Sequence, residues 1–151
     1  HACSIERRGK GYLFAGESGA GNSTLSILWD QRKGVEVLSD DRTIVRKQDG
    51  QFRIYGTPWH GDAPFGSPRS VRLEGIFFLG HGSKNAVREL NGAGAMLAFL
   101  KCSFPPYWDA PGMEAAMEIF EELANRVSCY ALSFKPDHSA IDFLEGISFL
   151  G

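Results

Sequence analysis

Three glycines, at positions 16, 19 and 21, constrain the fold of this chain more than any other feature of its sequence. They follow a short apolar segment, Tyr12 to Ala15, and come just before the hydroxyl pair Ser23-Thr24. Glycines let a turn bring its backbone N–H groups close to an anion, and a helix that starts directly afterwards adds the positive end of its dipole. The order of strand, glycine-rich turn and helix is therefore typical of a phosphate-binding P-loop.

The segment differs from the general pattern G-x-x-x-x-G-K-[ST] at one residue. Asn22 stands where the lysine that reaches the β- and γ-phosphates belongs, and Ser23 stands where a hydroxyl binds Mg²⁺. Loss of that positive charge should weaken nucleotide affinity or turnover. The alternative is a turn that needs positive φ angles and binds nothing. The predicted nucleotide-binding residues are Gly16, Glu17, Ser18, Gly19, Ala20, Gly21, Asn22, Ser23 and Thr24.

The hydrophobic pattern predicts a single α/β domain with a mixed β-sheet over residues 1–151. Asp49-Gly50 indicates a tight hairpin turn, and three prolines and three glycines between Gly56 and Ser70 indicate an irregular loop. The tail from Ala140 to Leu150 fits no single element. Strands are expected at 2–6, 12–15, 35–39, 43–45, 52–55, 73–79 and 128–134, and helices at 23–31, 91–102 and 112–126.

The composition excludes several classes of protein. A formal charge of −2, from 16 Lys and Arg against 18 Asp and Glu, gives no field that would attract nucleic acid or an anionic membrane. No apolar stretch is long enough to span a bilayer, and three scattered cysteines indicate reduced thiols in a cytoplasmic protein. The chain begins with His1 rather than Met, which leaves open that it is part of a longer protein.

Two adjacent carboxylates, Asp40 and Asp41, end the apolar segment Val37-Leu38-Ser39. Open α/β sheets place their ligand chemistry at such strand ends. Phosphoryl transfer uses one carboxylate to anchor the metal and another to orient or deprotonate the attacking hydroxyl. The alternative is a turn stabilised by the aspartate side chains before the next hairpin.

These features resemble the catalytic domain of the HPr serine kinase/phosphorylase family, which shares its nucleotide-binding core with phosphoenolpyruvate carboxykinase. The resemblance rests on His1 at the start of a strand, on the glycine-rich run from Gly16 to Gly21, and on the segment Leu38-Ser39-Asp40-Asp41 after the helix. It covers the first third of the chain well. Further on, Arg72-Leu73-Glu74-Gly75-Ile76 is similar to a degraded form of the family's second signature.

The resemblance implies ATP and Mg²⁺ as cofactors, and a phosphoryl transfer to a hydroxyl of a protein or peptide. It places His1 beside the acidic pair, with Asp40 as the base and Asp41 binding the metal together with Ser23. A homo-oligomer is also implied. Besides Asn22, the chain departs from the family at the position of a metal-binding glutamate, which is occupied by Ser70.

A phosphate site without its lysine still needs positive charge, and this singles out Arg42, after the acidic pair, and Arg72, in the second signature. His60, in the run from Thr57 to Asp62, is a further candidate for a substrate contact, although a rigid turn explains that run equally well. Two other functions stay open beside a protein kinase. One is a non-catalytic nucleotide sensor or interaction module, and the other is a kinase of small molecules.

Overall fold

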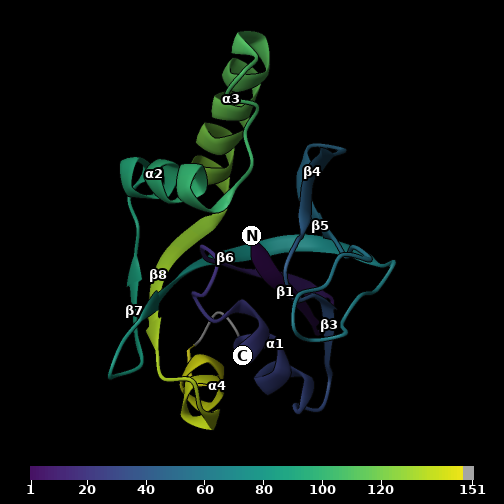
Figure 1. The fold of residues 1–151 in the computed structure, drawn as a ribbon, viewed down its shortest axis with the longest axis vertical. Helices are drawn as coiled ribbons and strands as arrows, with labels where there is room; N and C mark the ends of the chain where they lie inside the picture. The colour runs from purple at the N-terminus through teal and green to yellow at the C-terminus, as the bar shows by residue number, and fades with distance from the viewer. Residues whose placement is uncertain (148–151) are drawn as a thin grey trace.

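The computed structural model describes residues 1–147 as an α/β fold with a mixed β-sheet, which confirms the predicted fold class (Figure 1). The first part of the chain consists of seven strands with one helix between the second and third, and the second part contains three helices and one strand. The strands are β1 (Ala2–Arg7), β2 (Lys10–Ala15), β3 (Val35–Ser39), β4 (Ile44–Gln48), β5 (Gln51–Tyr55), β6 (Ser70–His81), β7 (Ala86–Glu89) and β8 (Ser128–Phe134). The helices are α1 (Asn22–Asp30), α2 (Gly92–Cys102), α3 (Ala110–Arg126) and α4 (His138–Glu145).

The long strand β6 organises the sheet. Its first residues pair antiparallel with β5, while the rest of the strand pairs parallel with β2 on one side and with β8 on the other. The strand order is β3-β1-β2-β6-β5-β4, and β8 with its antiparallel neighbour β7 completes the sheet beyond β6. Because β2 is a central strand, the loop that follows Ala15 leaves the sheet at its middle.

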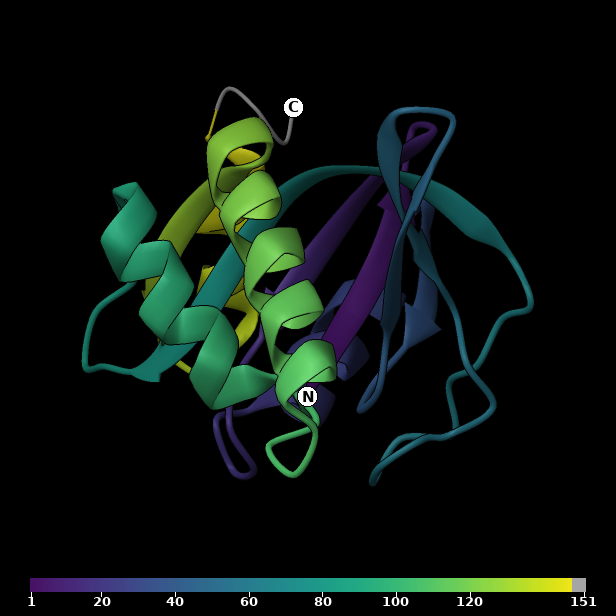
Figure 2. The ribbon, with the colours of Figure 1, turned by 90° about the horizontal axis from the view of Figure 1, so that it is seen from above.

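Helices cover the two faces of the sheet. In Figure 1, α1 and α4 lie on one side, while α2, α3 and the β4–β5 hairpin rise on the other. Under α1 and α4 the core is aromatic, with Phe14 stacked on Phe77 at a centroid distance of 5.1 Å and Trp29 fully buried. Under α2 and α3 a second core contains Phe78, Phe99 and Phe120. Figure 2 shows the α2–α3 pair and the hairpin side by side, seen from above.

Local sequence signals explain most of the turns and helix starts. Asp49 and Gly50 both have positive φ, of 50° and 74°, as a tight β4–β5 turn requires. The side chains of Asn91, Asp109 and Asp137 each accept a hydrogen bond from a backbone N–H of the helix that follows, α2, α3 and α4 in turn.

The helix α1 begins differently. Its N-cap position is Gly21, with φ of 102°, and within residues 1–147 no side-chain hydrogen bond caps its first turn. A helix whose first turn is left without a side-chain cap keeps those donors for another partner, and its dipole favours an anion there. This end of α1 faces the loop formed by residues 16–21, which we call the glycine-rich loop.

The structure differs most from the predicted elements at β7, which was not predicted, and at α4, which occupies part of the tail that fitted no single element. Several strands are also longer than predicted: β6 runs from Ser70 to His81 rather than over 73–79, and β4 ends at Gln48 rather than Val45. Residues 148–151 of that tail lie outside the described residues. In the part of the chain that is described, none of the helices is both long and apolar enough to cross a membrane.

Candidate functional site

The glycine-rich loop joins β2 to α1, and its packing requires glycine at two positions. A Cβ atom at Gly21 would lie 2.7 Å from the ring of Phe134, and one at Gly16 would lie 2.5 Å from the Cβ of Ala20. Gly21 and Gly19 also have positive φ, of 102° and 85°. Among the described residues, no atom lies within 4 Å of a Cβ built at Gly19, so packing against them does not explain its conformation. The loop geometry itself accounts for these glycines, whether or not a ligand binds.

Asn22 closes the loop from inside. Its side chain is buried, and its Nδ2 donates a hydrogen bond to the carbonyl oxygen of Gly16 at 3.2 Å. The Oδ1 atom of Asn22 is buried without a hydrogen-bond partner among the described residues. The amide therefore ties the first residue of the loop to the first residue of α1, while one of its polar atoms is unsatisfied.

Asp40 is fully buried and accepts hydrogen bonds from helix α1 and from one loop. The hydroxyl of Ser23 donates to its Oδ2 at 3.0 Å. The backbone N–H of Gly61 lies 3.0 Å from Oδ1, and the N–H of Ala63 lies 3.0 Å from Oδ2. Asp40 thus connects α1 to the segment of residues 56–69, which we call the 56–69 loop. A carboxylate so satisfied is held in one orientation.

Asp41 lies beside Asp40 but faces solvent, with 28% of its side chain exposed. Nδ1 of His1 lies 3.3 Å from its Oδ1, and Nε of Arg42 lies 3.4 Å from its Oδ2. The ring of His1 packs against Phe104, with the two centroids 4.7 Å apart. The side chain of Asp41 is therefore held between an imidazole and a guanidinium, and it is accessible to a ligand.

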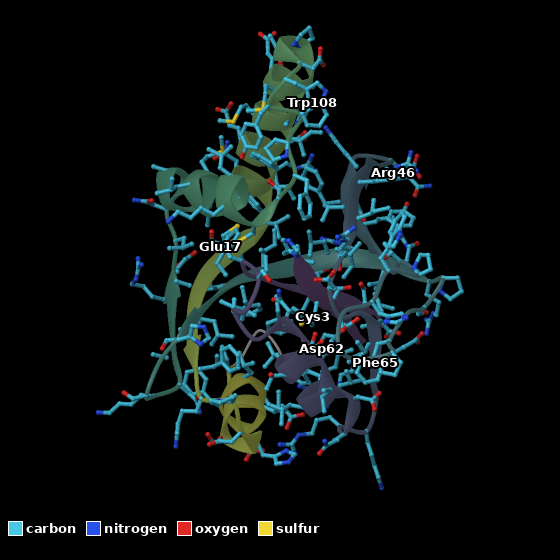
Figure 3. The ribbon with its side chains drawn as sticks, viewed as in Figure 1. Cys3, Glu17, Arg46, Asp62, Phe65 and Trp108 are labelled. Atoms are coloured by element: carbon cyan, nitrogen blue, oxygen red, sulfur yellow. The ribbon has the colours of Figure 1, made fainter. Side chains whose placement is uncertain are left out.

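A polar cavity of about 350 Å³ lies between the glycine-rich loop, the start of α1 and the 56–69 loop. Figure 3 labels Glu17 of the glycine-rich loop and Asp62 and Phe65 of the 56–69 loop. Among the described residues that line the cavity there is no lysine or arginine, whereas Asp41 and Asp62 are acidic. The lining residues are Ser18, Gly19, Gly21, Asn22, Ser23, Thr24, Asp41, Gly61 and Asp62.

The structure brings part of the predicted site together around the polar cavity. His1 does not line this cavity but contacts Asp41, which does. The predicted residues that line it are Ser18, Gly19, Gly21, Asn22, Ser23, Thr24 and Asp41, whereas Gly16, Glu17, Ala20, Asp40 and Arg42 are not part of its lining. Arg72 does not line it, and its Nε lies 3.0 Å from Glu74 on the same strand. His60 is exposed, and its Nδ1 lies 3.3 Å from the carbonyl oxygen of the next residue.

The sequence analysis paired Ser23 with Asp41 as metal ligands. In the structure the hydroxyl of Ser23 donates its hydrogen bond to Asp40, and Asp41 contacts His1. Sequence analysis also missed the two backbone N–H groups, of Gly61 and Ala63, that hold Asp40. The prolines and glycines of the 56–69 loop indicated only an irregular segment, because a backbone donor carries no side-chain signal.

Together, the mixed sheet, the glycine-rich loop and the acidic pair characterise the α/β fold of this chain. No family model and no curated protein matches the chain. Among solved structures, the chain is similar to the HPr(Ser) kinase/phosphatase from Coxiella burnetii, with a TM-score of 0.55 and 16% sequence identity. The match covers 96% of this chain and 84% of that one. The chain therefore shares the fold of this HPr(Ser) kinase/phosphatase.

Proposed function

We propose that this domain binds Mg²⁺-ATP and transfers a phosphoryl group to a serine or another hydroxyl of a protein or peptide. The observation that carries the proposal is the hydrogen bond from Ser23, at the uncapped start of α1, to Asp40 at the end of β3. In P-loop enzymes, a loop hydroxyl and a strand-end aspartate hold the metal. The fold, similar to that of an HPr(Ser) kinase/phosphatase, supports the same class of reaction.

The residues at this point fit Mg²⁺. Magnesium prefers oxygen ligands and keeps several waters, so one or two protein oxygens together with phosphate oxygens suffice. Ser23 Oγ and the carboxylate of Asp40 are 3.0 Å apart and supply such oxygens. Within residues 1–147 no group of three or more His, Cys, Asp or Glu residues that could hold a metal occurs, which agrees with a site completed by phosphate. Bound there, Mg²⁺ would neutralise charge on the phosphates.

The phosphates would lie against the glycine-rich loop and the first N–H groups of α1. Asp41 would receive the proton of the acceptor hydroxyl while that oxygen forms a bond to the γ-phosphorus and the bond to ADP breaks. His1, 3.3 Å from Asp41, would orient the carboxylate. Asp41 suits this role better than Asp40, because Asp41 is partly exposed and lines the polar cavity, whereas Asp40 is fully buried.

A second candidate function, a nucleotide sensor without catalysis, is favoured by one observation. None of the described residues that line the polar cavity carries a positive charge, because Asn22 replaces the P-loop lysine. Transfer of the γ-phosphoryl group depends on cations that stabilise the developing charge. A protein that only reports bound nucleotide does not need them.

Titration with ATP, ADP and GTP, each with and without Mg²⁺, tests the shared part of both functions. A binding isotherm for Mg²⁺-ATP that disappears in Ser23→Ala and persists in Thr24→Ala supports the metal site, because both residues border the same cavity. Transfer of labelled phosphate from ATP to a serine peptide separates the kinase from the sensor. Absence of binding for every nucleotide would contradict both.

A further inference from the structure

A second, mostly apolar cavity of about 480 Å³ lies on the face of the sheet opposite α1. Its floor is formed by sheet residues, among them Leu13, Ile76 and Phe78, and one wall by Phe99 and Phe120 of the two helices. These two rings stack with centroids 5.4 Å apart. A concave site of this size, lined by apolar and aromatic side chains, is typical of ligand pockets.

The cavity is bounded by α3 on one side and by the β4–β5 hairpin on the other. Figure 3 labels a residue next to each wall, Trp108 beside α3 and Arg46 on the hairpin. An ion pair between Lys47 and Glu122, with a distance of 2.6 Å, links the hairpin to α3, and Arg126 donates to the carbonyl of Gly50. These contacts tie the outer part of the hairpin to the C-terminal half of α3 and leave its N-terminal half without such a tie.

The cavity borders the polar cavity at Asp41. His1 and Arg42, which contact Asp41 from its two sides, both line the apolar cavity. The 56–69 loop contributes to both cavities, with Thr57 and Trp59 in the apolar one and Asp62 in the polar one. A group bound in the apolar cavity therefore lies next to the carboxylate that we propose as the proton acceptor.

Large apolar side chains surround the cavity and are exposed to solvent. Trp59 is 57% exposed, Phe104 is 64% exposed and Ile119 is 47% exposed, and all three line the cavity. The segment just before α3 adds Tyr107 and Trp108, which are 67% and 87% exposed. Exposed aromatic side chains gathered in this way are typical of surfaces that bind another polypeptide.

We propose that the apolar cavity receives a bulky apolar side chain of the phosphoacceptor polypeptide, one or two residues along its chain from the hydroxyl that meets Asp41. The role of the hydroxyl rests on the proposed function, whereas the binding of the apolar side chain does not. An extended peptide advances about 3.3 Å per residue, so neighbouring residues can occupy two adjoining cavities. The exposed aromatic side chains around the cavity would contact the rest of the peptide.

Fluorescence anisotropy with labelled peptides tests this inference without nucleotide. The probes are ten-residue peptides with a central serine in an alanine and glutamine background, with a single phenylalanine moved from three residues before the serine to three residues after it. We expect a phenylalanine within two residues of the serine to tighten binding about tenfold or more over the peptide without phenylalanine. Equal binding by all peptides would overturn the inference.

Two variants and a matched control locate the binding. Ile119→Asp, at the rim, and Ala116→Leu, inside the cavity, should each remove most of the preference for phenylalanine. Leu97→Asp changes an exposed apolar residue of α2, 58% exposed and outside the cavity, and should leave the preference intact. If the two cavity variants bind like the control while remaining folded by circular dichroism, the cavity is not the binding site and the inference is wrong.

Two further measurements distinguish peptide binding from the binding of a small molecule, and the apolar site from the proposed function. 2-Phenylethanol, used as a small competitor, should displace the peptide only at concentrations far above the peptide's Kd. Displacement at concentrations similar to the peptide's Kd would indicate that the cavity binds a small molecule, and the inference that it binds a polypeptide would be wrong. Ile119→Asp should also retain Mg²⁺-ATP binding. If the wild type lacks nucleotide binding and still prefers the phenylalanine peptide, the proposed function fails while the apolar site stands.

Discussion

Ser23 Oγ donates a hydrogen bond to Asp40 Oδ2 at 3.0 Å and thereby joins the start of α1 to the end of β3. These two residues are 17 positions apart in the sequence. The same carboxylate holds the 56–69 loop through the N–H groups of Gly61 and Ala63. The buried carboxylate of Asp40 therefore joins the start of α1, the end of β3 and the 56–69 loop. Its removal should lower the stability of the fold and weaken any metal binding.

ATP should bind only together with Mg²⁺. The described residues that line the polar cavity include two aspartates and no lysine or arginine, so a free triphosphate would be repelled. With Mg²⁺-ATP at about a hundred times its Kd, folding should gain about 2.7 kcal/mol. That gain corresponds to a rise of roughly 5–10 °C in the melting temperature. Differential scanning fluorimetry with ATP in Mg²⁺ and in EDTA measures the difference.

Two controls accompany this measurement. Mg²⁺ alone should change the melting temperature little, because the site is completed by phosphate oxygens. Ser23→Ala should abolish the rise with Mg²⁺-ATP, since it removes one of the two proposed protein oxygens. An equal rise with ATP in EDTA would show that a cation outside the described lining compensates for Asn22, and the metal-dependent mode of binding would have to be abandoned.

Asp40→Asn and Asp41→Asn should have different consequences. Asp40 is fully buried, and an amide in its place leaves at least one donor of Ser23, Gly61 or Ala63 without an acceptor. The expected loss is about 1–3 kcal/mol of unfolding free energy. Asp41 is partly exposed, so its replacement should cost less than about 1 kcal/mol. Urea unfolding of both variants measures these losses.

Of the two variants, Asp40→Asn should lose more stability, whereas Asp41→Asn should lose more turnover. Asp41→Asn removes the proposed proton acceptor and should lower kcat by about 10²–10⁴ with little change in nucleotide affinity. Asp40→Asn should instead raise the Mg²⁺ concentration needed for half-maximal binding of ATP. If Asp41→Asn keeps wild-type turnover on an identified acceptor, the carboxylate is structural and the proposed mechanism is wrong.

The sequence predicted the elements that depend on local signals. The β4–β5 hairpin follows from Asp49-Gly50, whose positive φ angles only a few residue types accept readily. The helix α3 was expected over 112–126, and it starts two residues earlier, at Ala110, where the side chain of Asp109 caps it. The strand β7 gave no such signal, because its four residues are largely exposed and are held by pairing with β8. Its pairing partner lies about forty residues away, and a local pattern does not contain that information.

The candidate site shows the same limit. The glycine-rich loop and the acidic pair were singled out as candidates because their residue types suit phosphate and metal binding. The hydrogen bond between Ser23 and Asp40 was not predicted. Which of the two carboxylates contacts Ser23 depends on how the end of β3 packs against α1. Arg72 was proposed for its position in a signature, and the structure pairs it with Glu74 instead. The sequence shows that an arginine is present. The residue with which it forms an ion pair depends on how the strands pack.

Thiol labelling should distinguish the three cysteines. Burial raises the pKa of the Cys129 thiol to about 12, and burial raises that of Cys3 further above its ordinary value. Cys102, half-buried at the apolar cavity, also has a raised pKa because of burial. Since the thiolate reacts, iodoacetamide should modify only Cys102 in the folded protein, at a rate that rises about tenfold per pH unit between pH 7 and 9.

Peptide mapping by mass spectrometry at each pH gives the rates for the three thiols separately. Full labelling of all three in urea is the control that the reagent reaches them when the chain is unfolded. The phenylalanine-containing serine peptide should slow the modification of Cys102, because that residue lines the apolar cavity. Labelling of Cys3 as fast as Cys102 in the folded protein would contradict the burial on which the prediction depends.

Restoring the P-loop lysine should tighten nucleotide binding. Asn22 now uses its Nδ2 to hold Gly16 and leaves its Oδ1 buried without a partner among the described residues. A lysine in its place removes that unsatisfied oxygen and brings an ammonium into a cavity lined by acidic and neutral residues. A charge-assisted hydrogen bond contributes about 1.5–3 kcal/mol, so Asn22→Lys should strengthen Mg²⁺-ATP binding roughly tenfold to hundredfold.

AMP should gain little from the same change, because the restored ammonium reaches β- and γ-oxygens that AMP lacks. Isothermal titration of both nucleotides at two salt concentrations measures the difference, and the gain for ATP should shrink at high salt. Asn22→Met, in which the new side chain is similar in length to lysine and uncharged, is the matched control and should bind ATP no better than the wild type.

If Asn22→Lys leaves the ATP affinity unchanged, Arg42→Ala decides the reason, with Arg72→Ala as its control away from the cavity. Loss of ATP binding only in Arg42→Ala would mean that this guanidinium, 3.4 Å from Asp41, already serves the phosphates. Unchanged binding in all of these variants would mean that the loop does not meet a triphosphate, and the kinase proposal would then fail.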